Sequence, residues 1–232
     1  MREFFFSAIA GSSNNDDKAL ISFISAFIPE LSIIPSLIKL PVAPARLQPA
    51  IESRLQTGVP GRKWQQLTAL YKSMDQPGQT ITEWCGGKGY LGRLLSKQWQ
   101  QQVVTLEFNP QLVAQGKKLT RKYAVAQQFK QLDVLQEPVG EFLQHHHTIA
   151  LHACGDLHRE LIHRIIETDA PGFTIVPCCY HLGREQHYTP FNPALRLQLS
   201  RDTLRLAVNE TVTAHQHEIV KRDRDMATAN LF

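Results

Sequence analysis

The residues best suited to chemistry gather in one glycine-rich segment, Glu83-Trp84-Cys85-Gly86-Gly87-Lys88-Gly89-Tyr90-Leu91-Gly92. A strand-like run, Thr80–Trp84, leads into this segment, and a helical pattern, Tyr90–Gln98, follows it. Glycines at a strand-to-helix turn permit a sharp bend and let a ligand approach the backbone closely. The N-terminus of the following helix adds free N–H groups and the positive end of a helix dipole. The segment therefore predicts a turn that binds a nucleotide-like cofactor.

Acidic residues stand at the ends of three successive predicted strands, over residues 80–84, 102–106 and 129–134; they are Glu83, Glu107 and Asp133. The glycines match the dinucleotide fingerprint G-x-G-x-x-G, and Glu107 follows at about the spacing of a ribose-binding acid, so an NAD enzyme is one alternative. A carboxylate at Glu83 suits a cationic ammonium group, whereas it would repel a pyrophosphate. Three such acids favour a cationic nucleoside without a diphosphate.

Read from Glu83, the pattern acid-x-Cys-x-Gly-x-Gly resembles the first motif of class I methyltransferases that depend on S-adenosylmethionine (SAM). The resemblance implies SAM as the cofactor, with Glu83 near the methionine amino group and Glu107 on the ribose hydroxyls. It implies that Asp133 accepts a hydrogen bond from the adenine amino group, although an aspartate after a strand often only begins a turn. The cofactor-binding residues that we predict are Glu83, Cys85, Gly86, Gly87, Gly89, Glu107, Asp133, Val134, Cys154 and Gly155.

Two further motifs follow the predicted fourth and fifth strands: Leu151-His152-Ala153-Cys154-Gly155-Asp156-Leu157 and Pro177-Cys178-Cys179-Tyr180-His181. With the glycine turn, they resemble a methyltransferase subgroup that contains a tRNA ribose 2′-O-methyltransferase and methyltransferase-like proteins, over roughly residues 60–215. The resemblance makes RNA a candidate acceptor. The predicted catalytic residues are Asp156, His152 and His181 as candidate bases and Tyr180 as a group that orients the acceptor.

All four cysteines fall at the ends of the first, fourth and fifth predicted strands, which are neighbours in a class I sheet. We therefore expect them to converge on one crevice. They could pack around the cofactor, serve the acceptor site, or bind zinc through Cys154, Cys178, Cys179 and His181. The sequence has no C-x-x-C pair, and adjacent cysteines rarely bind one metal comfortably, so the sequence assigns no metal.

Strands alternate with helices from residue 79 onward, with further strands at 148–151 and 173–176 and helices at 110–123 and 157–167. This alternation predicts an α/β fold, a Rossmann-like doubly wound and mainly parallel sheet. We expect a methyltransferase domain over 78–232 and a helical N-terminal cap over 1–77, with helices at 15–28, at 44–56 and after Pro60. No closing hairpin is evident after residue 182, which allows an incomplete sheet or a truncated chain.

Composition sets wider bounds. Of 232 residues, 43% are hydrophobic and 20% charged, as in globular proteins, and the net charge of +4 permits RNA without requiring it. Prolines interrupt the longest apolar stretch, 19–42, so we expect no membrane span, and four cysteines do not make a secreted disulfide framework. His145–His147 precede the fourth strand and are predicted to form a solvated loop.

The sequence thus predicts a cytoplasmic enzyme that transfers a methyl group from SAM to an unidentified acceptor, with RNA as a candidate. A SAM-binding module without turnover and an NAD-dependent oxidoreductase are the alternatives. Oligomeric state is not indicated by any pattern in the sequence.

Overall fold

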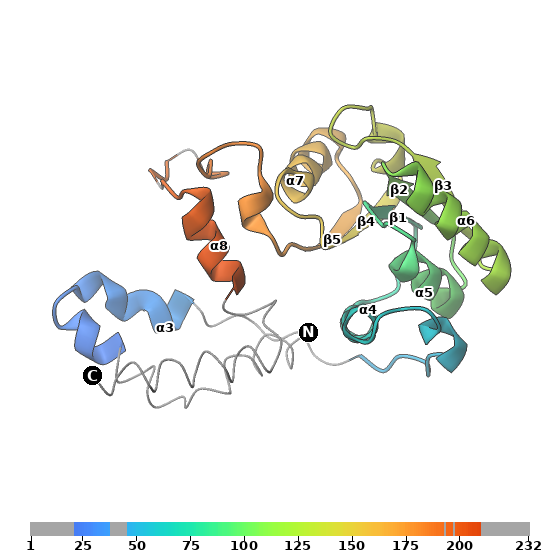
Figure 1. Cartoon of the computed structure of the whole chain (residues 1–232), viewed down its shortest axis with the longest axis horizontal. Helices are drawn as coiled ribbons and strands as arrows, with labels where there is room; N and C mark the ends of the chain where they lie inside the picture. Colours follow the sequence, from blue (N-terminus) through green and yellow to red (C-terminus); the bar gives the residue numbers. More distant parts are fainter. Residues whose placement is uncertain (1–20, 38–45, 193, 197, 210–232) are drawn as a thin grey trace. The chain divides into compact units, whose positions relative to one another are not determined.

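A five-stranded parallel sheet forms the centre of the compact unit of residues 46–208 (Figure 1). The computed structural model describes residues 21–37, 46–192, 194–196 and 198–209. The strands stand in the order β3-β2-β1-β4-β5. Their bounds are β1 Thr80–Trp84, β2 Val103–Glu107, β3 Gln127–Gln131, β4 His146–Leu151 and β5 Gly172–Val176. The order reverses between β1 and β4, as in doubly wound α/β folds, so the predicted fold class is confirmed.

Helices alternate with these strands along the chain. They are α4 (Gly61–Ser73), α5 (Tyr90–Trp99), α6 (Pro110–Tyr123), α7 (Asp156–Thr168) and α8 (Arg201–Asn209). The start of α6 is fixed by its sequence: Asn109 Oδ1 accepts hydrogen bonds from the N–H groups of Gln111 and Leu112, and Pro110 occupies the first turn. No helix in the described part of the chain is long and apolar enough to cross a bilayer.

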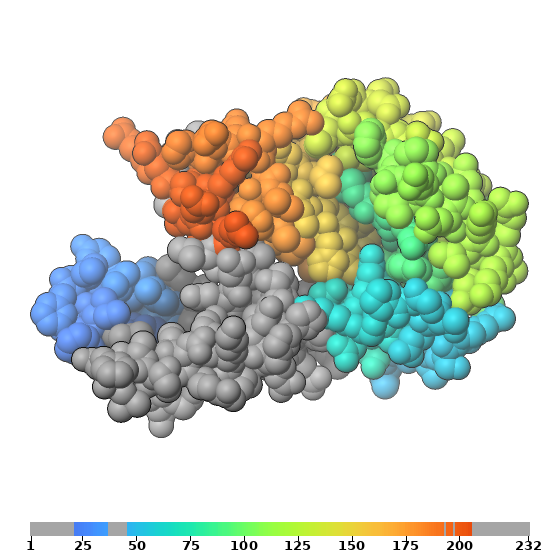
Figure 2. Space-filling model, in the orientation of Figure 1, coloured from blue at the N-terminus to red at the C-terminus, as the bar shows by residue number. Residues whose placement is uncertain are grey.

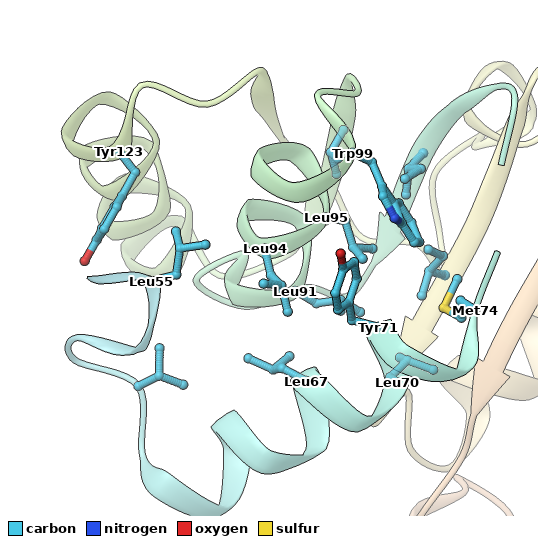
Figure 3. Packing of buried hydrophobic residues seen from close by; sticks show 14 residues of the cluster. Leu55, Leu67, Leu70, Tyr71, Met74, Leu91, Leu94, Leu95, Trp99 and Tyr123 are labelled. Atoms are coloured by element: carbon cyan, nitrogen blue, oxygen red, sulfur yellow. The ribbon is translucent and has the colours of Figure 1, made fainter. Parts of the chain in front are cut away.

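Each face of the sheet has its own hydrophobic core. On one face, Leu67, Leu70 and Tyr71 of α4 pack with α5 residues such as Leu95 and with the strand residue Ile81 (Figure 3). On the other face, a second cluster joins α7 to the sheet; it includes Trp84, Leu106, Ala150, Leu161 and Ile165. Side chains alternate across a strand, which explains why Ile81 and Trp84 belong to different cores.

Residues 46–208 form one compact unit, whereas the short helices η1 (Pro29–Ile33) and α3 (Ile34–Leu37) belong to another. The helix expected over 44–56 is wrong within its described part: the chain there is irregular and ends in a 3-10 turn, Ser53–Gln56. Of the helix expected over 15–28, residues 21–25 are helical, and its start lies outside the described residues.

Two local predictions need correction. The third strand ends at Gln131 and not at Val134. His146 and His147 do not lie in a solvated loop, because they begin β4 and pair with Thr80 and Ile81 of β1. Beyond β5, the described residues add a single antiparallel bridge, His187–Ser200, and no further strand.

Candidate functional site

The glycine turn joins β1 to α5 and takes a left-handed backbone at three positions, with φ of 54° at Cys85, 62° at Gly87 and 65° at Gly89. A Cβ atom on Gly86 would lie 2.5 Å from Glu83 Cδ, and one on Gly89 would collide with Gln127 and Phe129. Because these two glycines lack a side chain, the turn can pack closely against side chains of the sheet. A Cβ on Gly87 would meet no atom within 4 Å. The turn thus exposes bare backbone at Gly87.

Glu107, the last residue of β2, reaches across to this turn. Its Oε2 atom accepts a hydrogen bond of 2.8 Å from the Gly87 N–H, and its Oε1 atom accepts one of 2.8 Å from the Asn109 N–H. The side chain is partly exposed. A carboxylate with two acceptor atoms therefore lies beside the open backbone of the turn.

Glu83 lies beneath the turn and not beside it. It is only 3% exposed, and its Oε2 atom accepts a hydrogen bond of 2.7 Å from Thr105 Oγ1. The Gln127 amide lies 3.4 Å from the same atom. Burial raises the pKa of Glu83, although its hydrogen bonds and the positive charges of Lys63 and Arg93 act in the opposite direction. The structure therefore places Glu83 inside the protein, where it supports the turn.

Asp133 lies two residues beyond β3 and organises a turn. Its Oδ1 atom accepts a hydrogen bond of 3.0 Å from the Leu135 N–H, and its Oδ2 atom accepts one of 2.8 Å from the Gln136 amide. The neighbouring Val134 is buried in the second core. Both Asp133 carboxylate oxygens already have partners within the turn.

Cys85 is a partly buried thiol within the glycine turn. Its pKa is raised to about 12, mainly by burial and further by the negative charges of Glu107, Asp133 and Cys154. The convergence expected of the four cysteines is present for Cys154, Cys178 and Cys179, whose Sγ atoms lie within 4.8 Å of one another, whereas Cys85 lies outside that group.

His152 has a left-handed backbone with φ of 65°, and its Nε2 atom hydrogen-bonds to Gln66 Oε1 of α4 at 2.8 Å. Burial lowers its pKa, and the charge of Lys63 lowers it further. His152 therefore links the end of β4 to helix α4.

Cys154 and Cys178 meet where β4 and β5 end, with 2.7 Å between their Sγ atoms. The hydrogen bond with Cys178 is the main reason why the pKa of Cys154 falls to about 6, while the same hydrogen bond and burial raise the pKa of Cys178. The Gly155 N–H donates to the Cys179 carbonyl at 3.0 Å. The turns after these two strands are therefore joined through both side chain and backbone.

A cavity of about 300 Å³ opens beside these turns, next to α7. Asp156, Tyr180 and His181 line it, whereas His152 does not. Figure 2 shows α7 and the segment after β5 as one continuous yellow-to-orange surface. Asp156 Oδ2 accepts a hydrogen bond of 2.8 Å from the Arg184 N–H. Three of the four predicted catalytic residues thus share one cavity.

Sequence reasoning missed the arginines of this cavity, Arg159, Arg184 and Arg201. Arg201 donates to the Glu185 carbonyl at 3.0 Å and to the Gly183 carbonyl at 2.6 Å, and it thereby closes the loop after β5. Nothing in the sequence spacing indicates that these three arginines share a cavity. Arg159 belongs to α7, Arg201 begins α8, and Arg184 lies in the loop after β5, which has no periodic pattern. His181 Nδ1 is buried and has no hydrogen-bond partner among the described residues.

The glycine turn and the cavity lie at the carboxyl ends of the strands, around the place where strand order reverses between β1 and β4. Open α/β sheets bind their ligands at this position. The arrangement offers open space over the Gly87 backbone, a carboxylate across the turn, and a separate cavity with titratable side chains. Such a site can hold a cofactor and a second reactant side by side.

A protein-family model described as a methyltransferase domain matches residues 62–186, which is more than half of the chain. The match begins in α4 and ends beyond the Pro177–His181 motif. It therefore contains the glycine turn, the cysteines and most of the predicted site.

Curated relatives carry the name "Glutathione S-transferase C-terminal domain-containing protein". The one from Xenopus laevis is 27% identical over 192 residues, which cover 81% of this chain and 29% of that protein. The one from Mus musculus is 32% identical over 153 residues, which cover 64% and 23%. The chain spans less than a third of the length of these relatives.

Among solved structures, the tRNA (uracil-54, C5)-methyltransferase of Pyrococcus abyssi in complex with S-adenosyl-L-homocysteine is similar with a TM-score of 0.41 and 15% identity. The similarity covers 50% of this chain and 28% of that one.

Proposed function

The chain belongs to the methyltransferase-domain family, and from this premise we propose that it transfers a methyl group from SAM to a nucleoside of RNA. The bound sulfonium supplies an activated methyl group. Because that group already has a good leaving group, the protein chiefly has to align the acceptor and remove its proton. The family match supports methyl transfer, whereas the acceptor is proposed from the chemistry of the cavity and from the motif resemblance.

The observation that carries the cofactor proposal is the contact between Glu107 and the Gly87 N–H. A carboxylate with two acceptor atoms at the end of β2 suits the two hydroxyls of a ribose, and the open space over Gly87 admits a ligand to the backbone. Glu107, Cys85 and Gly87 would line the ribose and methionine parts of the cofactor. Glu83, which is buried, would act by holding the turn in place.

The acceptor would enter the cavity lined by Asp156, Tyr180 and His181. His181 is the better proposed base, because its imidazole lines the cavity; Nδ1 is buried, so Nε2 would be the ring nitrogen that accepts the proton. The Asp156 carboxylate already accepts from the Arg184 backbone, which suits a positioning role. Transfer would form the bond between acceptor and methyl carbon and break the bond between sulfur and that carbon, and the acceptor proton would pass to His181.

An RNA nucleoside fits the chemistry of this cavity. Tyr180 is 42% exposed and offers a ring on which a base can stack. Arg184, whose side chain is 69% exposed, can approach a phosphate. The resemblance of the motifs after β4 and β5 to a subgroup with a tRNA ribose methyltransferase points to the same acceptor class.

Calorimetric titration with S-adenosylhomocysteine and, in parallel, with NAD tests the cofactor. We expect binding of the former, weakened at least about tenfold by Glu107→Ala, because a hydrogen bond to a charged group contributes about 1.5–3 kcal/mol. Glu167→Ala on α7, an exposed carboxylate far along the chain from the turn, is the control and should bind normally. Binding of NAD alone would refute the methyltransferase function.

The acceptor is tested with SAM that carries a labelled methyl group. Total RNA, DNA and protein fractions are incubated with the chain, and we expect label in RNA that ribonuclease digestion releases. His181→Ala should abolish the label without changing S-adenosylhomocysteine affinity. Label confined to protein or DNA would exclude the RNA acceptor while it retained the cofactor proposal.

A further inference from the structure

Three thiols converge at the ends of β4 and β5, where Cys154, Cys178 and Cys179 bring their Sγ atoms within 4.8 Å of one another. The three residues come from two turns that lie 24 residues apart in sequence at Cys154 and Cys178. They are half-buried and not sealed in a core. Packing alone would not require their sulfur atoms to point at one another, since a thiol is only a weak hydrogen-bonding group.

The backbone holds these thiols in place. β4 pairs with β5 up to Leu151 and Val176, and the Gly155 N–H donates to the Cys179 carbonyl beyond the last pair. Gly155 has φ of 57°, and a Cβ atom on it would collide with the Leu182 carbonyl. The two turns therefore touch where only glycine fits. The cluster is preorganised by the fold and does not depend on flexible side chains alone.

We propose that Cys154, Cys178 and Cys179 bind a zinc ion as three thiolates. Zinc prefers such ligands at about 2.3 Å in tetrahedral geometry, which separates two sulfur ligands by about 3.8 Å. The Sγ atoms of Cys154 and Cys178 lie 2.7 Å apart and no pair in the group exceeds 4.8 Å, so zinc binding would require shifts of only about 1 Å in these separations. Although Cys178 and Cys179 are adjacent in sequence, their Sγ atoms lie within 4.8 Å of each other and of Cys154 Sγ.

Within the described part of the chain, no fourth histidine, cysteine or carboxylate ligand atom belongs to this group. Zinc sites with three protein ligands keep one position for water or a substrate, whereas structural sites usually have four. The proposed ion would therefore sit at the cofactor-side ends of β4 and β5 with one exchangeable position. This goes beyond methyl transfer, which needs no metal.

The test is a metal titration of the reduced, metal-free 232-residue chain, without SAM or any acceptor. With Co²⁺ as a spectroscopic probe, we expect a thiolate-to-cobalt charge-transfer band that saturates at one equivalent and disappears when Zn²⁺ is added. Cys154→Ser and Cys178→Ser should lose the band. Cys85→Ser is the matched control, because Cys85 lies outside the three-thiol group, and it should keep the band.

Absence of the charge-transfer band from the folded wild-type chain would overturn the proposal, whatever the variants do. An equal loss of the band in Cys85→Ser would also overturn it. Circular dichroism shows whether each variant is folded, and Cys179→His, which offers zinc another ligand, should retain more metal than Cys179→Ser. Because no cofactor is present, failure here is distinct from failure of the proposed methyl transfer.

Discussion

Glu83 is a carboxylate with almost no access to water, and its environment has a consequence for stability. Burial raises its pKa in the folded protein above the value in an unfolded chain. The folded state therefore holds the proton more tightly. Stability is then greatest below the unfolded pKa and falls as pH rises toward the folded pKa, because the buried group must ionise.

We expect Glu83→Gln to remove this pH-dependent loss. Glutamine cannot ionise, and its amide oxygen can still accept the hydrogen bond from Thr105. The free energy of unfolding of Glu83→Gln, relative to wild type, should therefore increase as pH rises from about 4 to 8. Urea unfolding across this range measures it. The exposed Glu167→Gln is the control, and a Glu83→Gln difference that does not change with pH would contradict the prediction.

The same residue shows what sequence can and cannot locate. Strand alternation and the glycine pattern correctly place Glu83 at the end of β1 and Glu107 at the end of β2. They do not reveal that Glu83 points under the turn, because this depends on the close approach of Gly86, Gly92 and Gln127 to its carboxylate. The convergence of Cys154, Cys178 and Cys179 followed from strand ends alone. The cavity arginines did not, because Arg184 lies in a loop without a pattern and Arg159 and Arg201 come from the separate helices α7 and α8.

At the scale of elements, the segment before α4 is held by tertiary hydrogen bonds and by the buried side chains of Leu55 and Val59, and not by helical periodicity. The Arg46 N–H donates to the Lys72 carbonyl at 3.3 Å, and the Gln48 amide donates to the Met74 carbonyl at 2.8 Å. The helix predicted over 44–56 fails because these tertiary hydrogen bonds keep the backbone extended. The strands and later helices were predictable, since their apolar spacing agrees with the cores that they bury.

Arg93 of α5 is one of the residues that contact that segment. Its side chain is 1% exposed, its guanidinium lies 4.9 Å from the centre of the Tyr90 ring and 4.6 Å from that of Tyr123, and it donates to the Leu55 carbonyl at 3.4 Å. Burial lowers its pKa. Its packing between two rings and its charge therefore make opposing contributions to stability.

We expect Arg93→Ala to lose about 2–4 kcal/mol of unfolding free energy, because it leaves a cavity between the two tyrosines. Arg93→Met should lose less than half as much, since it keeps the volume and removes a buried charge. Urea unfolding measures both, and limited proteolysis should cut Arg93→Ala first near residues 46–60. Equal losses in the two variants would show that the guanidinium and not its volume holds the segment.

At the scale of the whole molecule, the position of the domain boundary determines which part of the chain can fold independently. The sequence predicts a methyltransferase domain from residue 78, whereas contacts join residues 46–208 into one unit. Leu67, Leu70 and Tyr71 of α4 are almost fully buried against α5. A chain that begins at residue 78 would expose the surface of α5 that these side chains cover, and lose the hydrogen bond between His152 Nε2 and Gln66 Oε1.

We therefore expect a chain trimmed to residues 46–208 to unfold cooperatively and to bind S-adenosylhomocysteine as the 232-residue chain does. A chain trimmed to 78–208 should aggregate or lack a cooperative transition, because each buried leucine contributes about 2–3 kcal/mol and a whole face of the core is removed. Thermal unfolding and calorimetry on the two trimmed chains measure this. Normal folding and binding by 78–208 would establish the boundary at residue 78 and make α4 a detachable cap, whereas its collapse would make α4 part of the methyltransferase core.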